Sequence, residues 1–377
     1  MRIAINTRLL VKGKMDGIGW FTYETVKRMI KAHPEHTFYL LFDRKPSKEF
    51  LFSDCRNVVP VVLCPPARHP ILWWAFFEGA VSMALKRHHI DLFLSPDGFI
   101  PLHADIPTLT VIHDINFEHS TDNLRPSHQR YMTHFFPRFA KKATRIATVS
   151  AYSKNDISNT YHIDSKKIDV VYDGAHEGYR PHSEEEKTAI RRRFTDGKPY
   201  LIFISTILKR KNLANLLRAF DKIKQEDTTG LKLVVVGSRV WWQDELAEAY
   251  DNMANQCDVI MPGHVEPEEL SALLSAAEAL VYPSYFEGFG IPILEAMYAE
   301  TAVIASCTTS MPEVGGEAVL YIDPSQPDDI VHAIKQLSIP SIREEYIAKG
   351  RIQRTKFSWD ITTDLLWESM MKTVDSK

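Results

Sequence analysis

The sequence predicts an α/β protein with two domains in tandem, each built on a parallel sheet that helices cover on both faces. Its 377 residues are too many for one ordinary core and suit two domains of roughly 150–190 residues each. Short apolar runs alternate with amphipathic stretches along the chain, which is typical of parallel sheets. A charged stretch over 175–198, which contains Pro181 and Gly197, interrupts this alternation. We expect that stretch to be the linker.

The first series of elements precedes the linker. Apolar runs predict strands over 2–5, 37–42, 58–63, 92–95, 108–113 and 145–149. Amphipathic spacing predicts helices over 20–31, 73–86, 127–142 and 151–161. Parallel strands joined by helices bring their carboxyl ends to one edge of the sheet, where α/β proteins bind ligands.

The second series runs to the C-terminus. It has predicted strands over 167–172, 200–205, 231–237, 259–262, 279–283, 303–306 and 318–322. Predicted helices cover 213–226, 244–255, 267–276, 292–299 and 327–337. We expect a ligand to lie between the two domains, at the carboxyl ends of both sets of strands.

The composition narrows the class of protein. Hydrophobic residues make up 45% of the chain and charged residues 25%, as in an average globular protein, which argues against disorder. No apolar run approaches the roughly 20 residues of a membrane span, and the N-terminus leads into a strand without a signal peptide. The four cysteines show no CxxC spacing, so we expect a reducing cytoplasm rather than a disulfide framework or a zinc site.

Charge is divided unevenly along the chain. Residues 1–180 hold 24 Lys and Arg against 18 Asp and Glu, although the whole chain is at −3. Two interpretations stay open, solvated faces or contact with an anionic partner such as a membrane surface. The basic residues form no long run and no known motif accompanies them, so a nucleic acid is not expected.

Four tryptophans also leave alternatives open. Trp73 and Trp74 lie in an aromatic stretch over 71–77, which is either a core helix or a surface for an acceptor or a membrane. Trp241 and Trp242 either line a nucleotide cleft or cover the sheet.

The strongest motif runs from Glu287 to Glu295, where a strand ends, a glycine-rich turn follows and a helix begins near Pro292. Gly288 and Gly290 let the backbone approach a ligand closely. The N–H groups and the dipole of the helix start favour an anion such as a diphosphate. Carboxylates are poor phosphate ligands, so the two glutamates are expected to accept hydrogen bonds from hydroxyl groups. The alternative is that Glu295 only complements the helix dipole and Glu287 is a solvated loop residue.

A second motif joins the end of the strand at 205 to the helix at 213. Lys209, Arg210 and Lys211 are consecutive cations at a helix start, where they oppose the dipole unless an anion is bound. Lysine supplies a point charge and arginine a bidentate fork, which suit a phosphate. A solvated run of charge is the alternative.

Two weaker signals lie in the first half. Gly17 and Gly19 follow the first strand, but no third glycine completes a dinucleotide fingerprint. His113 and Asp114 follow the strand over 108–113, a position typical of functional residues, although a capping aspartate beside an exposed histidine is as good an interpretation.

Together these motifs resemble the retaining glycosyltransferases of sequence family 4, which have the GT-B fold, and among them the bacterial O-antigen and capsule mannosyltransferases. The resemblance spans nearly the whole chain and includes the two glutamates with seven residues between them. It is carried by Gly17, Gly19, His113, Asp114, 148–154, 170–174, 209–212, Gly237, 263–265, 287–295, 310–314 and 357–359. It implies two Rossmann-like domains, 1–178 on the acceptor side and 179–356 on the nucleotide-sugar side, with a final helix over 357–377 that crosses back onto the first domain.

The resemblance also implies roles for individual residues. Glu295 would bind the ribose hydroxyls, Glu287 would lie near hydroxyls of the donor sugar, and His113 would sit beside that sugar. Arg210 and Lys211 would neutralise the departing diphosphate. The donor would further be held by Gly288, Phe289, Gly290, Ile291, Gly17, Gly19, Ser205 and Gly237.

The activity implied is transfer of a hexose from a nucleoside-diphosphate sugar to a hydroxyl of a glycan or lipid-linked oligosaccharide, with retention. Mannose from GDP-mannose is the first expectation and UDP-sugars the next. No cofactor is expected, and no metal either, because no DxD cluster follows a strand. The first domain is expected to contact the inner face of a membrane peripherally. The alternative function is that of a catalytically silent nucleotide-sugar-binding protein. A third hypothesis is an epimerase or a sugar phosphorylase on the same fold.

Three positions depart from the family pattern. Ser205 stands where glycine is usual, Thr206 where many members have a phosphate-binding arginine, and Glu300 where the helix usually ends in glycine. The first two place more of the charge on Arg210. The third is expected to reduce stability, because glycine favours a left-handed helix end.

Overall fold

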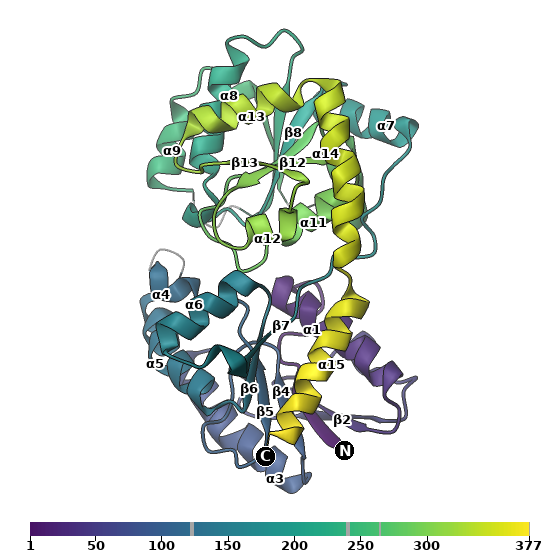
Figure 1. Cartoon of the computed structure of the whole chain (residues 1–377), viewed down its shortest axis with the longest axis vertical. Helices are drawn as coiled ribbons and strands as arrows, with labels where there is room; N and C mark the ends of the chain where they lie inside the picture. The colour runs from purple at the N-terminus through teal and green to yellow at the C-terminus, as the bar shows by residue number, and fades with distance from the viewer. Residues whose placement is uncertain (121–123, 239–241, 264, 377) are drawn as a thin grey trace. The chain divides into compact units, whose positions relative to one another are not determined.

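The computed structural model describes residues 1–120, 124–238, 242–263 and 265–376. The chain divides into two compact units (Figure 1). The first comprises Met1–Gly174 together with Trp359–Lys377, and the second comprises Ala175–Ser358. Both are α/β units on a wholly parallel sheet, so the predicted fold class is confirmed.

The sheet of the first unit has seven strands in the order β3-β2-β1-β4-β5-β6-β7. Chain order reverses on either side of β1, which pairs Ile3 with Phe38 of β2 and with Leu92 of β4, so the carboxyl end of β1 is a topological switch point. The strands are β1 (Arg2–Asn6), β2 (Thr37–Phe42), β3 (Val58–Val62), β4 (Leu92–Ser95), β5 (Thr108–Val111), β6 (Arg145–Thr148) and β7 (Ile168–Val170).

Helices cover both faces of this sheet because alternate strand residues point to opposite sides. Ile3 and Ile5 belong to one buried cluster with Phe21 and Leu366, from helices that pack side by side, whereas Ala4 belongs to the opposite cluster. The helices are α1 (Gly17–Ala32), α2 (Pro70–Trp74), a π-helical turn η2 (Ala75–Val81), α3 (Ser82–Arg87), α4 (Asn116–His119), α5 (Pro126–Lys142), α6 (Ala151–Tyr161) and α15 (Trp359–Asp375), with short 3-10 turns η1 (Lys48–Phe50) and η3 (Ser165–Lys167).

The sheet of the second unit has six strands in the order β10-β9-β8-β11-β12-β13. Chain order reverses at β8, which pairs with both β9 and β11. All residues of β8 and β12 are buried, as expected for strands covered on both faces. The strands are β8 (Tyr200–Ile204), β9 (Lys232–Val236), β10 (Val259–Gly263), β11 (Ala279–Tyr282), β12 (Ala302–Ser306) and β13 (Val319–Ile322).

The helices of the second unit pack around this sheet, with α8, α9 and α13 sharing one apolar cluster. They are α7 (Glu184–Thr195), η4 (Lys209–Lys211), α8 (Leu213–Lys224), α9 (Asp244–Asp251), η5 (Gln256–Asp258), α10 (Pro267–Ala276), α11 (Ile291–Tyr298), α12 (Met311–Gly315), α13 (Pro327–Leu337), α14 (Pro340–Gln353) and η6 (Arg354–Lys356). In the described part of the chain, no helix combines the length and the apolarity needed to cross a bilayer.

The predicted linker over 175–198 is wrong for most of its length, because α7 occupies it. Ser183 and Glu186 form a reciprocal capping box at the start of this helix, whose first turn is acidic and whose last turn is basic. Such end charges stabilise a helix through its dipole without an apolar stripe. Other element predictions fail as well. β7 belongs to the first sheet rather than the second, and α4, α12 and α14 are helices where none was predicted.

Candidate active site

The carboxyl edge of the second sheet brings the ends of β8 and β9 into contact at Gly237. This glycine has a φ of +143°, and a Cβ atom there would lie 1.8 Å from the carbonyl oxygen of Ser205. Ser205 itself donates its Oγ to the carbonyl of Thr206. Ser205 and Gly237 are thus neighbours, as a shared site requires, and glycine is needed for their close approach.

The three cations Lys209, Arg210 and Lys211 form a 3-10 turn ahead of α8 rather than its first turn. Asn212 follows them in the left-handed region with a φ of +57°. Its Nδ2 donates to the carbonyls of Pro283 at 3.0 Å and Pro324 at 2.6 Å. The turn is therefore fastened to the loop that follows β11, the neighbour of β8.

Glu287 lies between two of these cations. Its Oε1 accepts a bond from Lys211 Nζ at 2.6 Å, and its Oε2 accepts one from Arg210 Nη1 at 3.0 Å. The side chains of Glu287 and Lys211 are only 8% and 9% exposed, against 22% for Arg210. Glu287 is not a solvated loop residue, so that alternative is wrong.

The electrostatics of this cluster follow from its burial. Burial alone would raise the pKa of Glu287, but the charges of Lys211 and Arg210 and their hydrogen bonds outweigh it and hold the pKa at about 2. Lys211 Nζ also donates to the hydroxyl of Tyr282 at 2.9 Å, and Arg210 Nη1 to the carbonyl of Phe286 at 2.6 Å. Two cations therefore share one carboxylate at the carboxyl edge of the sheet.

The glycine-rich turn is shaped by Gly290 and Ser310. Gly290 has a φ of +105° and is the N-cap of α11, a conformation that a residue with a side chain rarely adopts. Ser310 Oγ makes hydrogen bonds with the carbonyls of Glu287 at 2.9 Å and Phe289 at 2.8 Å. These bonds hold the backbone of Gly288 to Ile291 at the start of α11, where a helix favours an anion.

Glu295 lies in the second turn of α11, so it is not a first-turn partner of the helix dipole. Burial raises its pKa to about 7, and the nearby hydroxyl of Tyr179 opposes this rise. Tyr179 was not among the predicted site residues. An aromatic residue within a polar, proline-containing stretch is the sequence signal that could have indicated it.

The remaining predicted residues lie at the carboxyl edge of the first sheet. His113 follows β5, its Nε2 bonds to the carbonyl of Pro96 at 2.9 Å, and its ring meets Phe21 edge-on. Burial lowers the pKa of His113, which favours the neutral ring with Nε2 as donor. Gly17 and Gly19 form the first turn of α1, three residues earlier than predicted, where Asp16 accepts from the N–H of Gly19.

The departure at Glu300 is accommodated by ion pairs. Glu300 adopts the left-handed helix end with a φ of +58°. Its carboxylate pairs with Arg351 at 2.7 Å and Arg354 at 3.4 Å. Arg354 Nη1 also donates to the carbonyls of Met297 and Tyr298 at the end of α11. The side chain therefore opposes part of the strain that its backbone conformation causes.

The tryptophans differ in their surroundings. Trp73 donates its Nε1 to the carbonyl of Ala67 at 2.9 Å and packs on the first core, whereas Trp74 is 52% exposed. Trp242 meets Tyr250 edge-on and packs on the second core. Trp241 lies outside the described residues.

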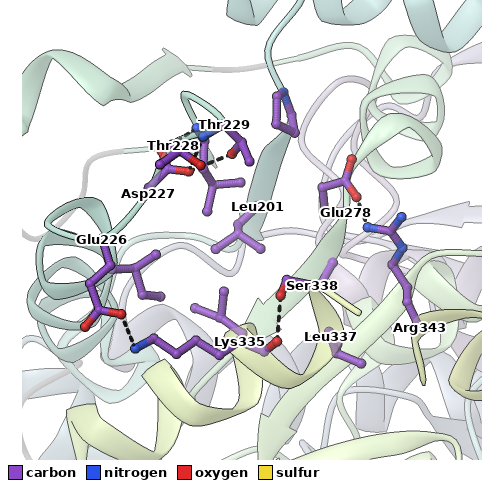
Figure 2. Close-up of a pocket in the computed structure, with 15 residues that line it drawn as sticks. Leu201, Glu226, Asp227, Thr228, Thr229, Glu278, Lys335, Leu337, Ser338 and Arg343 are labelled. Carbon is purple, nitrogen blue, oxygen red and sulfur yellow. Dashed lines mark hydrogen bonds and ion pairs between the residues drawn. The ribbon is translucent and has the colours of Figure 1, made fainter. Parts of the chain in front are cut away.

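A cavity of about 500 Å³ opens at the opposite edge of the second sheet (Figure 2). Leu201 and Ala279 line it, and they stand near the amino ends of β8 and β11. Figure 2 shows Lys335 reaching Glu226, and Arg343 pairs with Glu278. The charged side chains of this cavity pair with one another at its rim. The cavity is also remote from the carboxyl ends of the strands, so it is not the site that the motifs outline. Across the described residues, no group of three or more His, Cys, Asp and Glu side chains is arranged to hold a metal ion.

Two family models match the chain in succession. Residues 15–177 match glycosyltransferase family 4, and residues 184–353 match glycosyl transferases group 1. The chain belongs to the glycosyltransferases that these two models describe. The first model covers most of the first unit and the second most of the second unit, so the family resemblance read from the sequence is confirmed.

Relatives of this glycosyltransferase support the same conclusion. It is 29% identical over 363 residues to "O-antigen chain mannosyltransferase B" of Escherichia coli, covering 94% of this chain and 95% of that one. It is 28% identical over 269 residues to "O-antigen chain mannosyltransferase RfbU" of Salmonella typhimurium, covering 71% of each. The solved structure of Anabaena Alr3699/HepE in complex with UDP and glucose matches with a TM-score of 0.75 at 15% identity, covering 98% and 99% of the two chains. The structural likeness shows the shared GT-B fold.

Proposed function

We propose that this glycosyltransferase transfers mannose from GDP-mannose to a hydroxyl of a glycan or lipid-linked oligosaccharide, with retention and without a metal. The observation that carries the proposal is the buried cluster of Arg210, Lys211 and Glu287 beside the start of α11. The choice of mannose rests on the names of the two O-antigen relatives.

The cluster suits a departing nucleoside diphosphate. Arg210, the more exposed of the two cations, would take the diphosphate together with the N–H groups at the start of α11. Fixed cations and dipoles stabilise developing negative charge without reorganising during the reaction. Lys211 is the more buried cation and would keep the carboxylate of Glu287 ionised and oriented, so that it accepts hydrogen bonds from hydroxyls of the donor sugar.

The reaction would proceed by attack on one face of the sugar. The bond from the anomeric carbon to the diphosphate oxygen breaks, the acceptor oxygen bonds to that carbon from the same face, and the acceptor proton passes to the departing diphosphate. Glu295 would hold the ribose, and neutral His113 would lie beside the donor sugar. Anomeric NMR of the product tests retention, and activity in excess EDTA tests independence of metal. A trapped covalent glycosyl-enzyme would contradict the same-face mechanism.

A thermal-shift panel of nucleoside diphosphates and nucleotide sugars, followed by transfer assays, tests the function as a whole. Stabilisation grows with the ratio of free ligand to Kd, so GDP and GDP-mannose should raise Tm most. A larger effect of UDP-sugars would reassign the donor. Absence of stabilisation by every nucleoside diphosphate would overturn the proposal, and binding without donor hydrolysis or transfer would indicate a silent binding protein.

The first unit would contact an anionic membrane surface, which suits a lipid-linked acceptor. Ile71 and Trp74 are 71% and 52% exposed on the helical segment that begins at Pro70, and an exposed apolar patch of this kind can insert at a lipid interface. Co-sedimentation with phosphatidylglycerol vesicles should be lost in the double variant Ile71→Ser, Trp74→Ser. The matched control is Ile352→Ser, since Ile352 of α14 is equally exposed in the second unit. Equal sedimentation of both variants would contradict the contact.

A further inference from the structure

The loop that follows β4 is fastened to the end of β1 by one carboxylate, that of Asp97. Its Oδ2 accepts a bond from the Nε of Arg8 at 2.6 Å. Its Oδ1 accepts bonds from the Nδ2 of Asn6 at 2.8 Å, the Oγ of Ser95 at 3.1 Å and the N–H of Phe99 at 3.3 Å. A carboxylate has about four acceptor sites, so these four bonds satisfy Asp97 and define one conformation of the loop.

This cluster is buried at the topological switch point of the first sheet. The side chains of Arg8 and Asp97 are only 9% and 4% exposed, and the guanidinium of Arg8 lies 4.6 Å from the ring centroid of Phe99. Removing two charges from water costs free energy, and apolar residues of similar size often give equal stability. Stability alone therefore does not explain a buried ion pair here, whereas a need to fix the loop does.

The loop in turn holds His113 through the carbonyl of Pro96, the residue before Asp97. The Nε2 of His113 lies 2.9 Å from this carbonyl oxygen, and its ring meets that of Phe21 edge-on with the centroids 4.9 Å apart. A carbonyl can only accept, so Nε2 carries the proton of the neutral ring and Nδ1 has an acceptor lone pair. His113 is partly exposed, and no hydrogen bond from the described residues reaches its Nδ1. This nitrogen is therefore available to a hydroxyl of a ligand.

We propose that Asp97 is a positioning residue for the donor sugar, because it holds the carbonyl of Pro96 where that carbonyl fixes the tautomer and the orientation of His113. The Nδ1 of His113 then accepts a hydrogen bond from a hydroxyl of the sugar. This inference rests on the proposed function, in which His113 lies beside the donor sugar. A ring that is free to turn presents either nitrogen, with or without its proton, whereas a fixed ring presents one acceptor and loses less entropy when the sugar binds.

The first test compares ligands that differ only in the sugar. Asp97→Asn keeps the size of the side chain but removes the charge that pairs with Arg8. Dissociation constants of GDP-mannose and GDP are measured by calorimetry for the wild type and this variant, with UDP-glucose and UDP in parallel. The variant should bind the nucleotide sugar about 3- to 10-fold more weakly, as expected for one lost hydrogen bond. Its affinity for the free nucleotide should not change.

The second test observes the histidine ring directly. Long-range ¹H–¹⁵N NMR near neutral pH distinguishes the two tautomers of a neutral imidazole, and the signals of His113 are those that disappear in His113→Phe. The wild type should show the tautomer protonated at Nε2. Asp97→Asn should show a mixture of the two tautomers, because the carbonyl of Pro96 is no longer held in place.

Three further variants separate positioning from folding. Asp169→Asn breaks another ion pair of the same sheet, with Arg145 at the amino end of β6, and should lower stability without changing the dissociation constants or the His113 signals. In a His113→Phe background, Asp97→Asn should no longer weaken the binding of the nucleotide sugar. If Asp97→Asn does not fold, Ser95→Ala removes one of the four bonds to the carboxylate and should give the same pattern with smaller changes.

The outcomes are distinguishable. Equal weakening of GDP-mannose and GDP in Asp97→Asn would show a merely structural role and overturn the inference, as would no weakening of either. An unchanged tautomer of His113, or an undiminished effect in the His113→Phe background, would overturn it too. If the wild type binds none of the four ligands, the proposed function itself fails and this inference falls with it.

Discussion

Replacing Glu287 with glutamine removes the carboxylate that Arg210 and Lys211 share while keeping the size of the side chain. A fall of the Glu287 pKa from its ordinary 4.5 to about 2 corresponds to about 3 kcal/mol of stabilisation by the ionised form. The side chain is only 8% exposed, so solvent screens little of this. Breaking a buried pair from one side costs about 3–5 kcal/mol by comparison. We therefore expect Glu287→Gln to lose about 3 kcal/mol near pH 7.

The pH dependence of this loss follows from the direction of the shift. Because the folded pKa is depressed, the stabilisation is fully present above about pH 4.5 and disappears as the pH falls toward 2. The difference between wild type and variant should therefore be largest at neutral pH and shrink below pH 4.5. Urea unfolding at several pH values measures it, and near pH 7 the Tm should fall by roughly 6–12 °C.

The response of Tm to GDP distinguishes an ion pair at the donor site from one with a purely structural role. In Glu287→Gln the diphosphate of GDP can replace the missing negative charge, so the rise in Tm with saturating GDP should be at least as large as in the wild type, while sugar transfer falls strongly. Glu278→Gln is the matched control, because Glu278 pairs with Arg191 and Arg343 at the opposite edge of the sheet. That variant should lose stability with no change in its response to GDP. Wild-type stability of Glu287→Gln at pH 7, or a smaller response to GDP, would refute the reasoning.

Three other predictions concern single positions. The raised pKa of Glu295, about 7, means that its ionisation lowers stability as the pH rises from about 4.5 to 7. Glu295→Gln should thus be more stable than the wild type at pH 8 by up to about 3 kcal/mol, while GDP binding weakens. Urea unfolding at pH 5 and pH 8 measures the difference in stability. A variant that is less stable than the wild type at pH 8 would contradict the prediction. Gly237→Ala places a Cβ against the carbonyl of Ser205 and should lower the free energy of unfolding by at least about 2 kcal/mol. Its control, Gly263→Ala, also has a positive φ, of +81°, but among the described residues no atom outside its chain neighbours lies within 4 Å of the added methyl group. Equal losses in both variants would rule out the clash. Glu300→Gly relieves left-handed strain but removes two partly exposed ion pairs, so its stability should stay within about 1 kcal/mol of the wild type, and a larger loss in urea unfolding would show that the pairs dominate.

Most of the fold is readable from local patterns. Buried parallel strands appear as unbroken apolar runs, and the bounds predicted for β2, β4 and α6 agree with the structure. The two long helices that were missed, α7 and α14, are mainly charged and polar, so apolar periodicity could not reveal them. Ser183 and Glu186, which form the capping box of α7, were a sequence signal for this helix. The high charge of the segment led instead to the prediction of a linker.

Local sequence also determined which residues are candidates for the donor site. Glycines, cations and carboxylates that follow strand ends are visible as such, and the family pattern selects among them. Yet Glu287 meets Arg210 and Lys211, which lie more than 70 residues earlier in the chain, only because β8 and β11 are neighbours in the sheet. That neighbourhood is a property of strand order. Strand order depends on which surfaces the whole chain can bury, not on any local run of residues.

Tertiary structure alone decided the ionisation of the site. The same residue type has a pKa of about 2 at Glu287 and about 7 at Glu295. Glu287 lies between the cations Arg210 and Lys211, whose charges lower its pKa, whereas at Glu295 the effect of burial dominates and raises the pKa. Composition and motif spacing specify the groups. Their distances and the dielectric around them, which set each pKa, exist only once the chain has folded.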